Sequence, residues 1–201
     1  MTLGPPPRSL SKITLATESF PISALYRISR FSSGEPFFGK TASNRFDDRN
    51  PVKSRRYGTC YCGFDPETAI AETVLHDEMP VKGQFPISYS DFASRQLVRF
   101  KGEGLVLANL TGTSLKTLGG DGSISTVTPY RLHQLWSMAI HRHPQKVDGI
   151  GYISRHVNDR KAVAVFERAK HKFSGATYTP LPKVCNVMNA VASLHISFQW
   201  P

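Results

Sequence analysis

Apolar runs of strand length recur along the chain, with turn-forming residues between them. Their aromatic and β-branched side chains predict strands at residues 24–28, 57–62, 97–100, 105–110, 149–153 and 162–166. The last run is apolar throughout, which is typical of a central strand buried on both faces. The runs at 97–100 and 105–110 are joined through a Lys-Gly-Glu-Gly segment, and we expect them to form a hairpin.

Other segments repeat their apolar residues at spacings of three and four, as amphipathic helices do. This pattern predicts helices over residues 129–143 and 183–194. A further helix is expected to start at Pro66, with Asp65 as its N-cap, because both residue types favour these positions. The strand at 57–62 therefore runs directly into a helix.

Glu72 lies off the apolar face of this helix, which consists of Ile70, Ala71, Val74 and Leu75. It shares a stripe with Thr68 and His76, each four residues away. Such a stripe faces solvent, a partner or a cleft. On spacing alone, a solvated helix carboxylate is the simpler interpretation of Glu72.

The length of 201 residues suits one large domain, or one domain with an extension. Hydrophobic residues make up 40% of the chain, which is enough for a buried core. Residues 1–21 are rich in Pro, Ser and Thr and predict an extended or loosely docked arm, because this composition buries little. We therefore divide the chain into an N-terminal arm, 1–21, and a single domain, 22–201.

The net charge is +10, from 25 Lys and Arg against 15 Asp and Glu. This balance favours anionic partners, which include nucleic acid, a nucleotide phosphate, an acidic protein and an anionic membrane. The excess of basic residues keeps a nucleic-acid-binding module without catalysis as an alternative. No expected helix carries a stripe of Lys and Arg, however, so direct nucleic-acid binding is not expected.

Several sequence features bear on location. No apolar run approaches the roughly 18 residues of a membrane span, and the N-terminus lacks the continuous apolar core of a secretion signal. Three cysteines are too few for a disulfide framework. We expect a cytoplasmic protein that does not bind membranes.

Cys60, Cys62 and His76 are the candidates for metal or thiol chemistry. A Cys-x-Cys pair does not have the spacing of common structural zinc sites, and no metal site is predicted. A cysteine nucleophile would need an adjacent base. With seven histidines in the chain, a Cys–His pair can arise by chance, so this signal is weak. The glycine cluster at 119–122 lacks the Lys and Ser/Thr of a phosphate-binding loop.

Five short motifs occur in a characteristic order: LYRI at 25–28, SNRF at 43–46, YGTCY at 57–61, AET at 71–73 and YISRH at 152–156. In this order and spacing, over about residues 26–168, the sequence resembles the RES domain family. That family is named for an arginine, a glutamate and a serine, which match Arg27, Glu72 and Ser154. The family commonly has a glycine shortly before its second arginine, where this sequence has Ser43-Asn44, so the resemblance supports Arg27 more strongly than Arg45.

The resemblance implies an α+β fold similar to ADP-ribosyltransferase domains, with small curved mixed sheets around an NAD cleft and flanking helices. It implies that NAD⁺ is broken at its nicotinamide–ribose bond by phosphorolysis or hydrolysis, with transfer of ADP-ribose to a protein as the alternative. NAD⁺ is then a substrate rather than a cofactor, and inorganic phosphate is a candidate co-substrate. The resemblance also implies a toxin whose helix-turn-helix antitoxin plugs the cleft.

These implications, together with the chemistry of NAD⁺, give the expected site. Forked arginine donors suit the pyrophosphate, and a carboxylate suits the positive charge that develops on the ribose. A tyrosine ring stacks on nicotinamide or ribose, and a serine hydroxyl binds a phosphate oxygen or the carboxamide. The expected catalytic residues are Arg27, Glu72 and Ser154. The expected binding residues are Arg27, Arg45, Tyr57, Tyr61 and Ser154.

Overall fold

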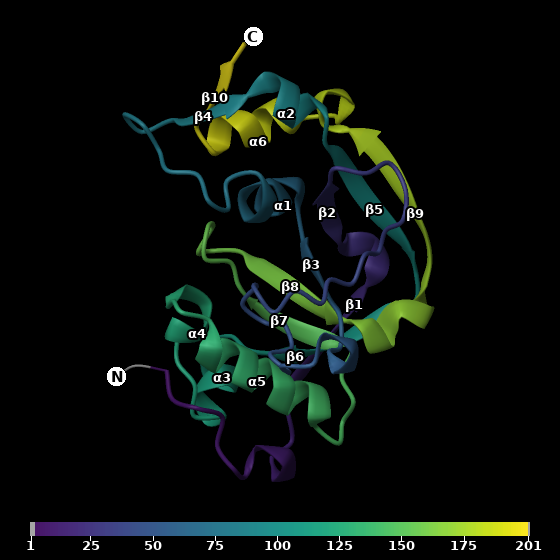
Figure 1. Cartoon of the computed structure of the whole chain (residues 1–201), viewed down its shortest axis with the longest axis vertical. Helices are drawn as coiled ribbons and strands as arrows, with labels where there is room; N and C mark the ends of the chain where they lie inside the picture. Colours follow the sequence, from purple (N-terminus) through teal and green to yellow (C-terminus); the bar gives the residue numbers. More distant parts are fainter. Residues whose placement is uncertain (1–2, 201) are drawn as a thin grey trace.

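The chain folds around one strongly curled, mixed sheet of eight strands (Figure 1). The computed structural model describes residues 3–200. In spatial order the strands are β1 (Thr17–Pro21), β6 (Gly104–Asn109), β7 (Gly149–Ile153), β8 (Lys161–Phe166), β3 (Thr59–Gly63), β2 (Tyr26–Ser29), β5 (Gln96–Gly102) and β9 (Phe173–Pro180). Neighbouring strands are antiparallel except for β6 and β7, which are parallel. A separate two-stranded parallel sheet pairs β4 (Phe85–Ser88) with β10 (Ile196–Gln199).

Helices cover the two ends of the curled sheet (Figure 1). At one end, beside the two-stranded sheet, lie α1 (Pro66–Thr73), α2 (Tyr89–Ala93) and α6 (Val187–Ser193). At the other end lie α3 (Gly112–Thr117), α4 (Ser123–Thr126) and α5 (Arg131–Arg142). Short 3-10 turns occur at Leu10–Lys12, Ile22–Ala24, Lys53–Arg55, Glu167–Lys172 and Leu181–Lys183. None of the helices in residues 3–200 is long and apolar enough to cross a membrane.

The junction between β3 and α1 has the local causes that the sequence predicted. Asp65 is the N-cap: its Oδ1 accepts a hydrogen bond of 2.8 Å from the backbone N–H of Thr68, and Pro66 opens the helix. Gly63 lets the strand end lie against the first turn, because a Cβ there would come within 2.8 Å of the nitrogen of Ala69. The helix buries Ile70 completely and is thereby fixed against the sheet.

Three apolar clusters fill the space between these elements. One lies between the sheet and α5 and contains Trp136, Ile140, Ile150 and Phe166. A second joins α1, α6 and the ends of β2 and β5, through Ile70, Val191 and Leu97 among others. The third occupies the inside of the curl and contains Cys60, Cys62, Val98, Leu105 and Val163. The strand at 162–166 is central, between β7 and β3, and fully buried, as its unbroken apolar run predicted.

The predicted hairpin of residues 97–100 and 105–110 is wrong. Both strands exist, but β5 pairs with β2 and β9, whereas β6 pairs with β1 and β7. The chain turns a corner at Gly102, whose φ is +149° and whose Cβ would lie 2.0 Å from the carbonyl oxygen of Lys172. The close contact leaves room only for glycine, and the corner sends β6 to the other half of the curl.

The expectation of a loosely docked N-terminal arm is also wrong for the described residues. Leu3, Leu10 and Leu15 are each less than 5% exposed and belong to the cluster under α5. β1 pairs with β6 over its whole length. Composition missed this packing because three spaced leucines are enough to anchor a segment that is otherwise polar. The helix predicted over residues 183–194 is shorter in the structure, where it spans Val187–Ser193.

Candidate active site

A cavity of about 310 Å³ opens where β2, β3, β7 and α1 approach one another. It is lined by Arg27, Asn44, Arg45, Tyr61, Glu72, Thr73, His76, Asp77, Tyr130, Tyr152, Arg155 and His156. A wider and more open groove of about 750 Å³ adjoins it and shares five of these residues: Asn44, His76, Asp77, Tyr130 and Arg155. The two volumes lie in the range of small-molecule sites.

Glu72 enters this cavity from the last turn of α1, so it is not the solvated helix carboxylate that spacing alone favoured. Its Oε1 accepts a hydrogen bond of 2.5 Å from the hydroxyl of Ser154. The Ser154 Oγ in turn accepts hydrogen bonds of 3.1 Å from the backbone N–H groups of His156 and Val157. Ser154 is fully buried, and the chain of hydrogen bonds fixes the carboxylate in place.

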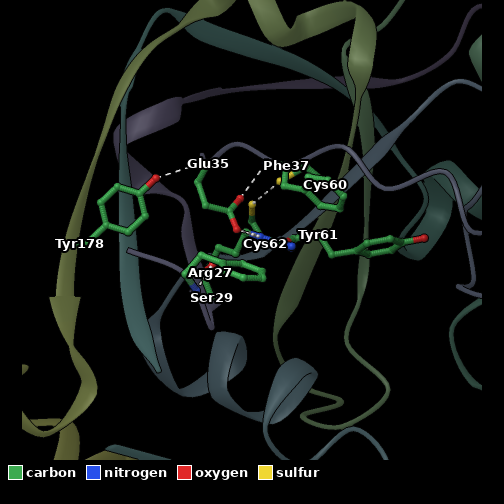
Figure 2. Close-up of polar contacts among 9 residues, drawn as sticks. Arg27, Ser29, Glu35, Phe37, Cys60, Tyr61, Cys62 and Tyr178 are labelled. Atoms are coloured by element: carbon green, nitrogen blue, oxygen red, sulfur yellow. Dashed lines mark hydrogen bonds and ion pairs between the residues drawn. The ribbon is translucent and has the colours of Figure 1, made fainter. Parts of the chain in front are cut away.

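Arg27 lies on β2 and points into the same cavity. Its Nε donates to Oε1 of Glu35 at 3.0 Å, and its Nη1 donates to the carbonyl oxygen of Tyr61 at 2.9 Å (Figure 2). Within residues 3–200, its Nη2 makes no hydrogen bond. Two protein contacts therefore set the plane of the guanidinium, and one edge remains for a ligand.

Two further arginine side chains, those of Arg45 and Arg155, contact Tyr130. The guanidinium carbon of Arg45 lies 4.6 Å from the centre of the Tyr130 ring, and Nη1 of Arg155 donates to its hydroxyl at 3.3 Å. Arg45 is 7% exposed, and burial lowers its pKa from the ordinary value of an arginine. An arginine side chain stays charged even when it is buried. The guanidinium groups of Arg27, Arg45 and Arg155 therefore face one cavity together with the carboxylate of Glu72.

Tyrosine rings form much of the wall. The hydroxyl of Tyr61 donates to Oδ1 of Asp47 at 3.1 Å and accepts from the backbone N–H of Phe46 at 2.8 Å. Burial, followed by the charge of Asp47, raises the pKa of Tyr61 well above its usual value. Burial and the carboxylate of Glu72 raise the pKa of Tyr152 in the same way. Both phenols are therefore neutral, and their role at this wall is to pack and to exclude water.

The rings of His76 and His156, which both line the cavity, lie side by side with their centres 5.2 Å apart. Burial, the charge of Arg155 and the neighbouring His76 lower the pKa of His156 to about 4. His156 is therefore neutral at pH 7. It does not add a fourth positive charge to the cavity.

Four of the six expected site residues line the cavity: Arg27, Arg45, Tyr61 and Glu72. Ser154 lies directly behind Glu72, and its hydroxyl hydrogen is directed at the carboxylate. This differs from the expectation that the hydroxyl binds a phosphate oxygen or the carboxamide of the substrate. Tyr57 is not brought to the cavity. Its ring stacks on His141 at 3.9 Å and its hydroxyl pairs with that of Ser137 at 2.8 Å, so it belongs to the core beside α5.

Sequence reasoning missed several residues of the site, chiefly Tyr130, Tyr152 and Glu35. Tyr130 lies within the helix predicted over residues 129–143, whereas the helix begins at Arg131. Tyr152 was part of a strand pattern, in which an aromatic side chain is ordinarily a core residue. Glu35 lies in a Gly- and Pro-containing loop with no periodicity, and no sequence signal could connect it with Arg27.

The residues considered for a metal do not come together. The Sγ atoms of Cys60 and Cys62 are 4.0 Å apart inside the curl of the sheet, whereas His76 lines the cavity. Among residues 3–200, no group of three or more His, Cys, Asp or Glu side chains is placed to hold a metal ion.

Comparisons with known proteins agree with this geometry. A chain in the crystal structure of the M. tuberculosis MbcT–MbcA toxin–antitoxin complex has a similar fold, with a TM-score of 0.58 at 10% sequence identity. The similarity covers 92% of this chain and 98% of that chain, and it confirms the α+β fold with a curved mixed sheet. No curated protein sequence matches the chain. The family model of the RES domain matches residues 24–184, a range that includes every cavity-lining residue, and the chain therefore belongs to the RES domain family.

Proposed function

We propose that this protein consumes NAD⁺ by cleaving the bond between nicotinamide and ribose. The observation that carries the proposal is the placement of Glu72. Its carboxylate is held by Ser154 in a cavity that also contains Arg27, Arg45 and Arg155. A fixed negative charge beside a cluster of positive charges matches a substrate that carries a pyrophosphate and develops a cation on its ribose. Membership of the RES domain family supports the same substrate.

In this mechanism Glu72 acts on the ribose. As the bond to nicotinamide breaks, positive charge spreads over the ring oxygen and the anomeric carbon, as in glycoside cleavage. The carboxylate stabilises this charge, and its Oε2, which accepts no hydrogen bond within residues 3–200, can hold a ribose hydroxyl. Nicotinamide leaves as a neutral molecule, so the reaction needs no strong general acid. The neutral His156 and the high pKa of Tyr152 are compatible with this requirement.

The arginines bind and orient the dinucleotide. Arg27 offers the free edge of its guanidinium to the pyrophosphate from a rigid strand. Arg45 and Arg155 lie across the cavity around Tyr130, where they can hold a second anionic group of the substrate or an anionic acceptor. Tyr61 and Tyr152 close the wall between these groups and shield the bound substrate from bulk solvent.

The biological role we propose is that of a toxin in a toxin–antitoxin pair. The solved structure with the similar fold is a complex of a toxin and an antitoxin, which supports this role. The partner is expected to be a helix-turn-helix antitoxin that covers the cavity.

The acceptor of the ADP-ribosyl group decides the name of the reaction. Purified protein should be incubated with NAD⁺, with and without inorganic phosphate, and the products measured by mass spectrometry. Phosphate-dependent ADP-ribose phosphate indicates phosphorolysis, free ADP-ribose indicates hydrolysis, and a labelled protein indicates transfer. If folded protein releases no nicotinamide under any of these conditions, the enzyme proposal is wrong. Salt-sensitive retention of a nucleic acid would then favour the non-catalytic alternative.

A further inference from the structure

Glu35 is a buried carboxylate that directly contacts the arginine expected to bind the pyrophosphate. Its side chain is 4% exposed, although it lies in the loop between β2 and β3. Its Oε1 accepts from Nε of Arg27 at 3.0 Å, and its Oε2 accepts from the backbone N–H of Phe37 at 2.8 Å. The backbone N–H of Glu35 itself donates to the hydroxyl of Tyr178 on β9 at 2.8 Å (Figure 2).

This arrangement constrains Arg27 more tightly than the other arginines of the cavity. Arg27 has two contacts of 3.0 Å or less, and the side chain of its partner Glu35 is nearly inaccessible to solvent. Arg45 makes two contacts of 3.4 Å with backbone carbonyl groups, and Arg155 has one contact of 3.3 Å with Tyr130. Of the three cavity arginines, Arg27 therefore makes the shortest hydrogen bonds, and these set the direction of its free edge.

A negative charge next to an anion-binding arginine has two opposite effects. It reduces the positive potential that attracts the dinucleotide, so by charge alone its removal should tighten binding. It also holds the guanidinium plane in one orientation, so by geometry its removal should weaken binding, because the ligand would then have to order a long, flexible side chain. The two effects predict changes of opposite sign.

We propose that Glu35 is a positioning residue, which turns the free Nη2 edge of Arg27 toward the bound dinucleotide, and that this geometric effect outweighs its charge. The inference rests on the proposed function for the identity of the ligand, but not for the orientation of Arg27. Because Tyr178 holds the backbone of Glu35, β9 takes part in the same arrangement without reaching the cavity.

The test compares Glu35→Gln with Glu103→Gln, which removes the same charge from an exposed position. Three kinds of measurement are made on the full chain. They are the NMR signal of the Arg27 Nε–H group, assigned through Arg27→Lys, the affinities for NAD⁺ and for inorganic pyrophosphate, and the kinetic constants KM and kcat for NAD⁺. We expect a slowly exchanging Nε–H signal in the wild type and in Glu103→Gln, and a broadened or lost signal in Glu35→Gln. NAD⁺ affinity and KM should worsen at least tenfold in Glu35→Gln, with a smaller loss in kcat.

Equal or tighter binding of both ligands by a folded Glu35→Gln variant would overturn the inference, and so would an unchanged Arg27 signal. If the wild type leaves NAD⁺ intact but Glu35→Gln still loses the signal and binds pyrophosphate tenfold more weakly, the positioning role stands and only the proposed reaction fails. If Glu35→Gln does not fold, Tyr178→Phe provides the second variant. It should broaden the same signal and lower the affinities for NAD⁺ and pyrophosphate two- to fivefold. An unchanged signal and unchanged affinities would refute the arrangement.

Discussion

Replacing Ser154 by alanine tests the central hydrogen bond of the site. The substitution removes the 2.5 Å donor to Glu72 and leaves the backbone N–H groups of His156 and Val157 without their acceptor. A hydrogen bond to a charged group contributes about 1.5–3 kcal/mol, and an unsatisfied buried group costs about 1–3 kcal/mol. We expect the free energy of unfolding to fall by about 3 kcal/mol. The melting temperature should then fall by roughly 6–12 °C for a domain of this size.

The same change should act on catalysis through the orientation of Glu72. Without its donor, the carboxylate can rotate away from the ribose and be hydrated, and part of the preorganised charge is lost. We expect turnover of NAD⁺ to fall roughly 10- to 100-fold, with a small change in affinity, because the carboxylate acts mainly in the transition state.

Ser137→Ala is the matched control. Ser137 is also fully buried, and its hydroxyl donates to the carbonyl oxygen of Phe46 at 2.6 Å and contacts that of Tyr57. It should lose comparable stability yet keep its turnover, since it does not reach the cavity. Nicotinamide release, NAD⁺ affinity and thermal unfolding are measured on both variants below their melting temperatures. If both variants turn over NAD⁺ equally fast, the positioning of Glu72 by Ser154 is refuted.

Three further predictions concern the same cavity and its surroundings. Glu72→Gln should keep the fold and most of the NAD⁺ affinity but lose turnover by at least 100-fold, as measured by nicotinamide release; full activity would show that the carboxylate has no catalytic role. Arg27→Ala should lose more activity than Arg155→Ala, since Arg155 has one weak protein contact; equal, small losses would show that Arg27 is the wrong anchor. The pKa values of His141 and His156 are lowered to about 4, below the ordinary value, so the unfolded chain binds more protons than the folded chain between about pH 6.5 and 4. Stability should therefore fall as pH decreases through this window, and urea unfolding of His141→Phe should show a shallower loss; an identical pH dependence would contradict this origin.

The local elements of the fold were the parts that sequence could predict. The start of α1 follows from Asp65 and Pro66, and the buried run of β8 follows from its unbroken apolar residues, because these causes lie within a few neighbouring positions. The hairpin prediction failed because the pairing partners of β5 and β6 depend on a corner at Gly102. The carbonyl group that restricts this position to glycine belongs to Lys172, which is 70 positions away in the chain.

The site was predicted in the same uneven way. The family resemblance is confirmed, and it selected Glu72, which lines the cavity, whereas spacing alone favoured a surface carboxylate. It could not say which of two tyrosines on one strand-like run faces the cavity. Tyr57 precedes β3 and packs toward α5, whereas Tyr61 lies within β3 and faces the cavity. That difference depends on where the strand begins, which a sequence pattern leaves open by a few residues.

The direction of the Ser154 hydroxyl has a consequence for how the substrate can be held. Its oxygen accepts two backbone N–H groups, and its single hydrogen points to Glu72. A serine hydroxyl has only one hydrogen to donate, so in this arrangement Ser154 cannot also donate to a phosphate oxygen or to the carboxamide. If the substrate is NAD⁺, as proposed, recognition of its pyrophosphate therefore depends on the arginines, and on Arg27 most directly. In the proposed reaction the serine acts one step further from the substrate, by holding the carboxylate of Glu72 in the orientation that faces the ribose.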